Sequence, residues 1–257
     1  MANENNNETP KKISQSERTN AKNLENLHTA IAIVTSIGAG YTPTNPLIEK
    51  DALLEFERTF ETMTQSVLTA TADEQNKVDA QINAFKPVSS RVSLIMKSVR
   101  AQGLDPLFIE GLQSTVYRLN GIRVGRNTPD ESPAGGTDAD TGNSSVSRRS
   151  YAGILENLQM FSTQLTSNPA HNPNETEFKS PAITAWVNGL NITHDDALEA
   201  KVATRTERAE LKAYAYNDTD GLIPRMKILK NYLGYVLDKN DPRLKQLKSL
   251  KFTKAKK

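Results

Sequence analysis

The sequence of 257 residues contains no cysteine, a single tryptophan (Trp186) and no apolar run long enough for a membrane helix. The absence of cysteine excludes a disulfide framework and thiol chemistry. A bilayer-spanning helix needs about 20 predominantly apolar residues. Residues 1–20 are Asn-rich and charged, without the apolar stretch of a secretory signal. These absences predict a soluble, cytoplasmic protein.

Alternation of apolar and polar residues, which is typical of half-buried strands, is also missing. Apolar residues recur at intervals of three and four, which places them on one stripe of a helix. Such stripes run from Leu24 to Val34, from Leu53 to Phe85, from Val88 to Val99 and from Leu107 to Leu119. The sequence therefore predicts an all-α fold.

Glycine and proline mark where these helices end. Gly38 follows the first stripe, and Asp105-Pro106 has the N-cap and N1 residues that begin a helix. No Gly or Pro interrupts residues 47–86, so this stretch predicts a helix of roughly 50 Å at 1.5 Å per residue. Ala72-Asp73 is the place where we expect a break, if there is one.

The second half of the sequence repeats landmarks of the first. Leu24-Glu25-Asn26-Leu27 recurs as Leu155-Glu156-Asn157-Leu158, and a second long helix is predicted from about Pro181 to Tyr216. The other matched landmarks are Phe56 with Trp186, Arg91 with Arg225, and Asp105-Pro106 with Asp241-Pro242. Their order is kept, and the spacing between the two copies drifts only slightly along the chain. We therefore interpret the sequence as an internal duplication.

These patterns predict two tandem antiparallel helical bundles, each with three long helices and one short helix. The predicted domains are a disordered tail over 1–16, a first bundle over 17–125, a linker over 126–149, and a second bundle with a basic tail over 150–257. Residues 126–149 are rich in Gly, Ser, Pro and Asp, which favours a flexible linker. The alternative is a single bundle in which both halves pack together.

The net charge of +2 conceals a strongly basic C-terminus, because residues 243–257 carry seven basic and no acidic side chains. This tail is a candidate anion-binding segment for nucleic acid or an anionic membrane surface. Alternatively, its leucines pack as a short amphipathic helix, followed by a frayed basic end. The candidate residues are Arg243, Lys245, Lys248, Lys251, Lys254, Lys256 and Lys257.

Three polar groupings could suggest a metal site, and each has a simpler interpretation. Glu25 and His28 have a di-iron ligand spacing, but the second copy has Gln159 where His28 stands. His194-Asp195-Asp196 cannot converge on one ion if these residues are helical, so a solvated charged turn is favoured. Asp138, Asp140 and Gly142 lack the spacing of a calcium loop. Trp186 and Phe56 are predicted to be core residues.

The ending Gln246-Leu247-Lys248-Ser249-Leu250-Lys251-Phe252-Thr253-Lys254-Ala255-Lys256-Lys257 resembles that of a group of uncharacterised bacterial proteins. The resemblance also covers the two helical halves and the linker between them. It implies two tandem helical-bundle repeats, a Lys-rich C-terminus and a bacterial source, and it carries no site residues.

We predict no catalytic, cofactor-binding or metal-binding residues and no cofactor. The first functional hypothesis is a non-catalytic structural or interaction protein that binds a protein partner. The alternative is an anion-binding accessory protein that acts through its basic tail. An enzyme is the third hypothesis, and a hydrated pocket with two or more carboxylates would favour it.

Overall fold

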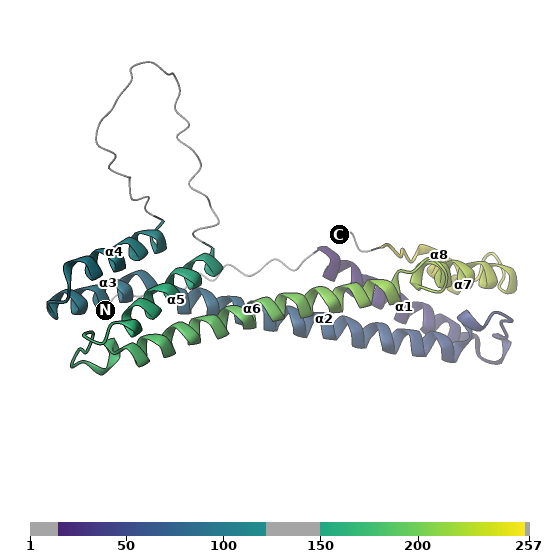
Figure 1. Ribbon diagram of the computed structural model, residues 1–257. Helices are drawn as coiled ribbons and strands as arrows, with labels where there is room; N and C mark the ends of the chain where they lie inside the picture. The colour runs from purple at the N-terminus through teal and green to yellow at the C-terminus, as the bar shows by residue number, and fades with distance from the viewer. Residues whose placement is uncertain (1–14, 122–149, 255–257) are drawn as a thin grey trace, which may run out of the picture. The chain divides into compact units, whose positions relative to one another are not determined.

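A computed structural model describes residues 15–121 and 150–254, and these residues form helices and connecting segments without any strand (Figure 1). The all-α prediction is therefore confirmed for the described chain. The helices before the gap are α1 (Gln15–Ile37), α2 (Lys50–Phe85), α3 (Val88–Ala101) and α4 (Pro106–Leu119). Those after it are α5 (Tyr151–Ser167), α6 (Ser180–Ala215), α7 (Leu222–Val236) and α8 (Pro242–Ser249).

Helix boundaries follow the residues that predict them. The carboxylates of Asp105 and Asp241 accept hydrogen bonds from backbone N–H groups in the first turns of α4 and α8, each of which has Pro at its first position. Gly38 and Gly103 follow α1 and α3 with positive φ angles of 64° and 63°. This left-handed conformation favours glycine, so both residues stop a helix.

The two long helices are also confirmed, and each contains 36 residues. α2 continues through Ala72 and Asp73 without a break, because this stretch has neither Gly nor Pro. α1 begins at Gln15, within the tail predicted over 1–16. The rest of that tail and the whole predicted linker over 126–149 lie outside the described residues.

The described residues divide into two compact units. One unit, here called the α1 unit, contains those up to Ala72 and from Val202 onwards. The other, called the α5 unit, contains those from Asp73 to Lys201. This division differs from the predicted domains 17–125 and 150–257, because α2 and α6 each contribute one part to each unit. Both units therefore draw on both halves of the sequence.

The core of the α1 unit is formed by five helices or parts of helices. From the first half of the sequence come α1 and the first part of α2; from the second half come the last part of α6 and the whole of α7 and α8. Leu27, Phe60 and Leu229 are fully buried in it, together with Leu222 and Leu247. Each such side chain contributes about 1.5–3 kcal/mol by leaving water. The apolar stripes predicted from the sequence are the faces that meet here.

The core of the α5 unit is built in the same way. It combines the last part of α2 and the whole of α3 and α4 with α5 and the first part of α6. Ile95, Leu158, Phe161 and Ile183 are fully buried in this core, and Leu112 is nearly so. In the part of the chain that the structure describes, no helix has the length and apolarity to cross a bilayer.

Candidate functional site

The basic C-terminal tail is docked on the α1 unit from α8 to Lys254. Leu244 and Leu247 of α8 are 1% and 0% exposed, while Lys245 and Lys248 on its other face are exposed. α8 thus has the amphipathic character expected from its leucine spacing. The hydrophobic face holds the helix in place and leaves these two cations facing solvent.

Beyond α8, two buried asparagines of α1 hold the extended chain. The Asn23 amide donates to the carbonyl of Thr253 at 2.7 Å and accepts from its N–H at 3.2 Å. Asn26 donates to the carbonyl of Lys251 at 2.8 Å. Two side chains of α1 therefore satisfy backbone hydrogen-bonding groups of the segment 250–254, as a paired strand would in a sheet.

The Asn23 amide belongs to a larger buried network. It also donates to the Tyr216 hydroxyl at 2.8 Å, and that hydroxyl donates to Asn20 at 2.5 Å. Burial raises the pKa of Tyr216, so the hydroxyl stays protonated and remains a donor. The network joins α1, the end of α6 and the C-terminal segment.

Lys230 of α7 fixes the segment through other contacts. Its ammonium group donates to the carbonyl of Leu250 at 2.6 Å and lies 5.6 Å from the centre of the Phe252 ring. Burial lowers the pKa of Lys230. This lysine has a structural role and lies outside the predicted cationic tail.

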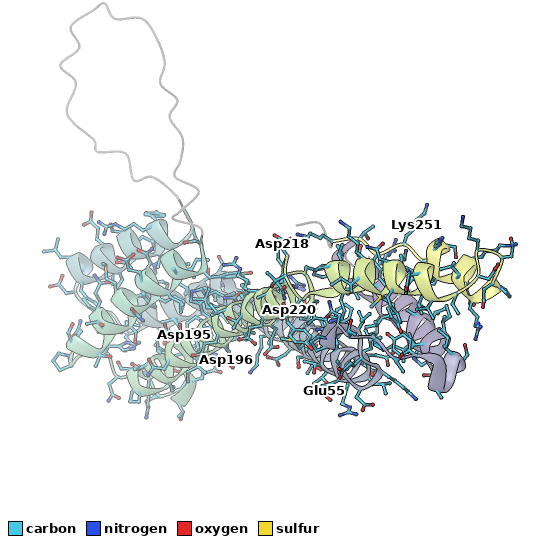
Figure 2. The ribbon with its side chains drawn as sticks, turned by 90° about the vertical axis from the view of Figure 1, so that its right-hand side faces the viewer. Glu55, Asp195, Asp196, Asp218, Asp220 and Lys251 are labelled. Carbon is cyan, nitrogen blue, oxygen red and sulfur yellow. The ribbon has the colours of Figure 1, made fainter. Side chains whose placement is uncertain are left out.

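Two of the predicted tail cations are engaged with carboxylates. Arg243 lies 2.7 Å from Asp241, and this contact lowers the pKa of the Asp241 carboxyl. Lys254 lies 2.5 Å from Asp218, whose pKa falls for the same reason. Lys245, Lys248 and Lys251 are exposed (Lys251 and Asp218 are labelled in Figure 2). Lys256 and Lys257 lie outside the described residues.

A pocket of about 580 Å³ lies where α1 meets the docked segment. Its charged lining residues are Arg18 and Lys22 of α1 and Lys251 of the segment, and no carboxylate is among the described residues that line it. The remaining lining residues are Thr19, Asn23, Asn26, Ser249, Leu250 and Thr253. The structure thus brings one predicted cation together with two that the sequence analysis did not identify.

Arg18 and Lys22 were missed because they lie near the opposite end of the sequence from the tail. They are one helical turn apart, so they share one side of α1. Asn23 and Asn26 offered a weak signal, since they interrupt the predicted apolar side of α1 with groups that need hydrogen-bond partners. Their partners are backbone groups, which a sequence pattern does not reveal.

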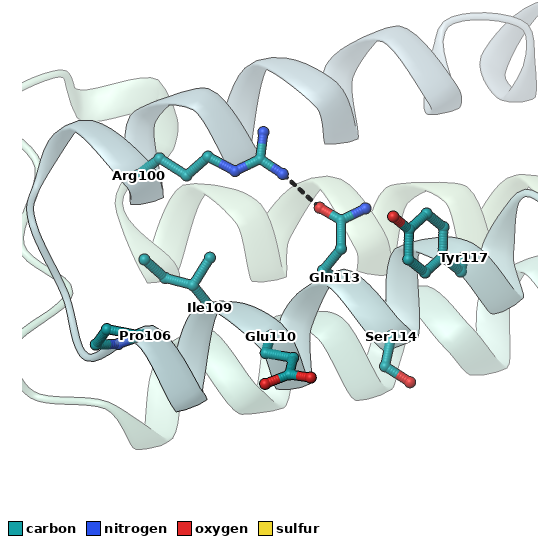
Figure 3. Close-up of a pocket in the computed structure, with 7 residues that line it drawn as sticks. All are labelled: Arg100, Pro106, Ile109, Glu110, Gln113, Ser114 and Tyr117. Atoms are coloured by element: carbon teal, nitrogen blue, oxygen red, sulfur yellow. Dashed lines mark hydrogen bonds between the residues drawn. The ribbon is translucent and has the colours of Figure 1, made fainter. Parts of the chain in front are cut away.

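A second pocket of about 580 Å³ lies along α3 and α4 (Figure 3). Its lining includes Arg100, which donates to the Gln113 side chain at 2.5 Å, together with Tyr117; among the described residues Glu110 is the single carboxylate there. One carboxylate beside an arginine does not form the pair that general acid–base hydrolysis of a sugar requires. This pocket gives no support to a specific reaction.

The histidines have structural partners. His28 is exposed and lies 3.0 Å from Glu57, and His194 contacts the Gln81 side chain at 2.6 Å. The prediction of a charged turn at 194–196 is wrong, because these residues lie within α6, where Asp196 pairs with Lys77 at 2.9 Å. Figure 2 labels Asp195 and Asp196 there. Over residues 15–121 and 150–254, no group of His and carboxylate side chains could hold a metal ion.

The two matched aromatic residues, Phe56 and Trp186, lie in different units, and each contacts an arginine. Phe56 is buried, whereas Trp186 is only half-buried against the core of the α5 unit. The Arg225 guanidinium lies 4.5 Å from the centre of the Phe56 ring, and the Arg91 guanidinium lies 4.6 Å from that of Trp186. Both are cation–π contacts.

Comparison with known proteins gave no match to a family model, a curated protein or a solved structure.

Proposed function

We propose that this protein is a non-catalytic structural or interaction protein built from a duplicated helical module. The observation that carries the proposal is the pair of arginine–aromatic contacts. Arg91 and Arg225 hold matched positions in the two halves of the sequence, and so do their aromatic partners, Trp186 and Phe56. Each contact joins an arginine from one half of the sequence to an aromatic residue from the other half.

A second matched pair of contacts supports the duplication. The Tyr41 hydroxyl donates to the carbonyl of Ile48, and the His171 ring donates through Nε2 to the carbonyl of Phe178 at 3.1 Å. Donor and acceptor have the same separation in both contacts, which lie in the segments that lead into α2 and α6. The offset between the two contacts is the one that also relates Phe56 to Trp186. Different side chains thus close the same turn in each copy.

The bonds of the buried polar groups support the structural part of the proposal. Arg225 donates to the carbonyl of Leu47 at 2.5 Å, and Thr204 donates to that of Ala70 at 3.0 Å. With the Asn23 network, these groups join helices from the two halves of the sequence. Two copies of one module on a single chain would engage a repeated partner bivalently, which raises affinity through effective concentration.

The test is affinity capture from cells that produce the protein, followed by reconstitution with the purified partner. We expect two partner sites for each chain by isothermal titration calorimetry or sedimentation. Turnover of a small molecule by the purified chain, without such a partner, would contradict the proposal.

The second candidate function is anion binding through the tail, favoured by the exposed side chains of Lys245, Lys248 and Lys251. Deletion of 243–257 would be a poor test, because it removes the buried Leu244 and Leu247. Lys245→Gln with Lys248→Gln removes charge and keeps the packing. Retention of DNA, RNA and anionic vesicles that does not change in this double variant would eliminate binding through α8.

A further inference from the structure

The pocket between α1 and the C-terminal segment has a rigid wall. Asn23 is 1% exposed, and its amide pairs with both backbone groups of Thr253. Asn26 holds the carbonyl of Lys251, and Lys230 holds that of Leu250. These contacts fix the backbone of three residues that line the pocket. The backbone of this wall is therefore fixed before a ligand binds, which removes one part of the entropy cost of binding.

The pocket lining is positively charged. Arg18, Lys22 and Lys251 line it, and Lys22 pairs with Glu25 at 2.9 Å. The two side chains of that pair are 63% and 67% exposed, so solvent screens the pair strongly. An anion in the pocket can therefore compete for Lys22. Three cationic side chains around one pocket favour a ligand with more than one negative charge.

Three cationic side chains favour a phosphate, which carries more negative charge than a single carboxylate. A guanidinium group binds phosphate through two parallel hydrogen bonds, and lysines add point charges. The hydroxyls of Ser249 and Thr253 also line the pocket and add donors. At about 580 Å³ the space falls within the range of small-molecule sites and exceeds what a bare phosphate fills.

We propose that this pocket binds the terminal phosphate or diphosphate of a compact phosphorylated molecule. Arg18 and Lys22 contact the phosphate from α1, and Lys251 contacts it from the docked segment. The proposal deepens the second candidate function, since it moves anion recognition from the tail alone to a pocket in which the tail forms one wall. It is independent of the duplicated-module proposal.

The test uses the full chain and isothermal titration calorimetry with inorganic phosphate and pyrophosphate at fixed ionic strength. We expect pyrophosphate to bind more tightly than phosphate. The double variant Arg18→Gln/Lys22→Gln should weaken pyrophosphate binding at least tenfold, and Lys251→Gln should weaken it several-fold. The matched control is Lys227→Gln/Lys239→Gln, which removes the same charge from exposed positions of the α1 unit outside the pocket and should change affinity less than twofold. The tail variant Lys245→Gln/Lys248→Gln is measured beside it.

Two further arms distinguish the source of the phosphate. A 5′-phosphorylated oligonucleotide is compared with its 5′-hydroxyl form, and vesicles containing phosphatidic acid are compared with phosphatidylcholine vesicles. A phosphate-dependent gain in either arm identifies that source as the ligand that presents the phosphate. Gain in neither arm, with pyrophosphate still bound, indicates a small soluble ligand.

The outcomes separate the pocket from the tail function. A loss in Lys245→Gln/Lys248→Gln as large as that in Arg18→Gln/Lys22→Gln would overturn the pocket and leave non-specific binding by the tail. Failure of the unmodified chain to bind phosphate or pyrophosphate at millimolar concentration would also overturn it. All the substituted side chains are exposed, so the thermal unfolding midpoint should stay unchanged.

Discussion

The side chain of Asn23 joins three parts of the α1 unit, since one amide on α1 contacts Tyr216 and both backbone groups of Thr253. Asn23→Ala leaves these buried groups without partners. We expect a loss of about 2–3 kcal/mol in the free energy of unfolding by urea. Hydrogen exchange at the Thr253 amide should also accelerate, because its acceptor is gone.

The control for this prediction is Asn157→Ala on α5. The Asn157 amide is half-buried and donates to the carbonyl of Gly153 within its own helix, at 2.7 Å. Loss of that bond exposes no group of another element, so the change should stay below about 1 kcal/mol. Equal losses at the two positions would show that Asn23 does not hold the C-terminal segment.

His171 predicts a pH dependence of stability. It is 7% exposed, and its Nε2 donates to the Phe178 carbonyl while Nδ1 has no hydrogen-bond partner among the described residues. Burial lowers the pKa of His171, although the bond to Phe178 acts in the opposite direction. The folded protein therefore takes up this proton less readily than the unfolded chain.

The sign of the effect follows from that difference. An unfolded histidine takes up its proton near pH 6.5, so the contribution of His171 is complete above this pH and is lost as the pH falls below it. Urea unfolding at pH 7.5 and 5.5 measures this. His171→Gln keeps an N–H donor but does not titrate, and it should flatten the dependence. An equal slope in the two proteins would contradict the prediction.

At the scale of elements, the connection between α6 and α7 depends on close backbone packing at Gly221. A Cβ atom there would lie 2.6 Å from the carbonyl oxygen of Asn217, and the Asn217 side chain accepts from the N–H of Gly221 at 3.0 Å. Gly221→Ala should therefore destabilise the α1 unit by about 1–3 kcal/mol, because the backbone must shift.

Gly234 on α7 provides the matched substitution. It is exposed within the helix, and a Cβ atom there would meet nothing within 4 Å. Gly234→Ala should raise the free energy of unfolding by up to about 1 kcal/mol, because alanine favours helix. Thermal or urea unfolding of the two variants measures both effects. A neutral Gly221→Ala would show that the connection can move at little cost.

At the scale of the whole molecule, each unit depends on both halves of the sequence. α1 packs with α7 and α8 in one unit, and α4 packs with α5 in the other. If a specific protease site is inserted within residues 126–149 and cut, we expect the two fragments to stay associated. They should elute from a sizing column with the uncut 28.4 kDa chain.

Urea should separate the two fragments, and this provides the control for the cut. Separation in native buffer would contradict the packing, because each fragment would then have to bury its own apolar stripes. The domain prediction from the sequence, with bundles over 17–125 and 150–257, expects that separation. The alternative in which both halves pack together expects association.

The sequence by itself determined the elements. Periodicity at three and four residues, Gly at positive φ and Asp-Pro at helix starts all act within a few residues, so they were readable without a fold; the long helix predicted over 181–216 is observed over 180–215. Lys251 was also identified from the sequence, because the charge of the last fifteen residues is evident without a fold.

Only the tertiary structure decided which helices pack together and which side chains join Lys251. The two halves present similar apolar stripes, so the stripe of α1 could pack against α3 or against α7. Hydrophobic contacts are not directional, so the pattern alone does not select one of these two helices. Because α1 packs with α7 and α8, the segment after α8 reaches Asn23 and Asn26. The bond from Asn26 to the backbone of Lys251 places this lysine at the same pocket as Arg18 and Lys22. Such a bond depends on where the backbone lies in space, which the sequence pattern does not reveal.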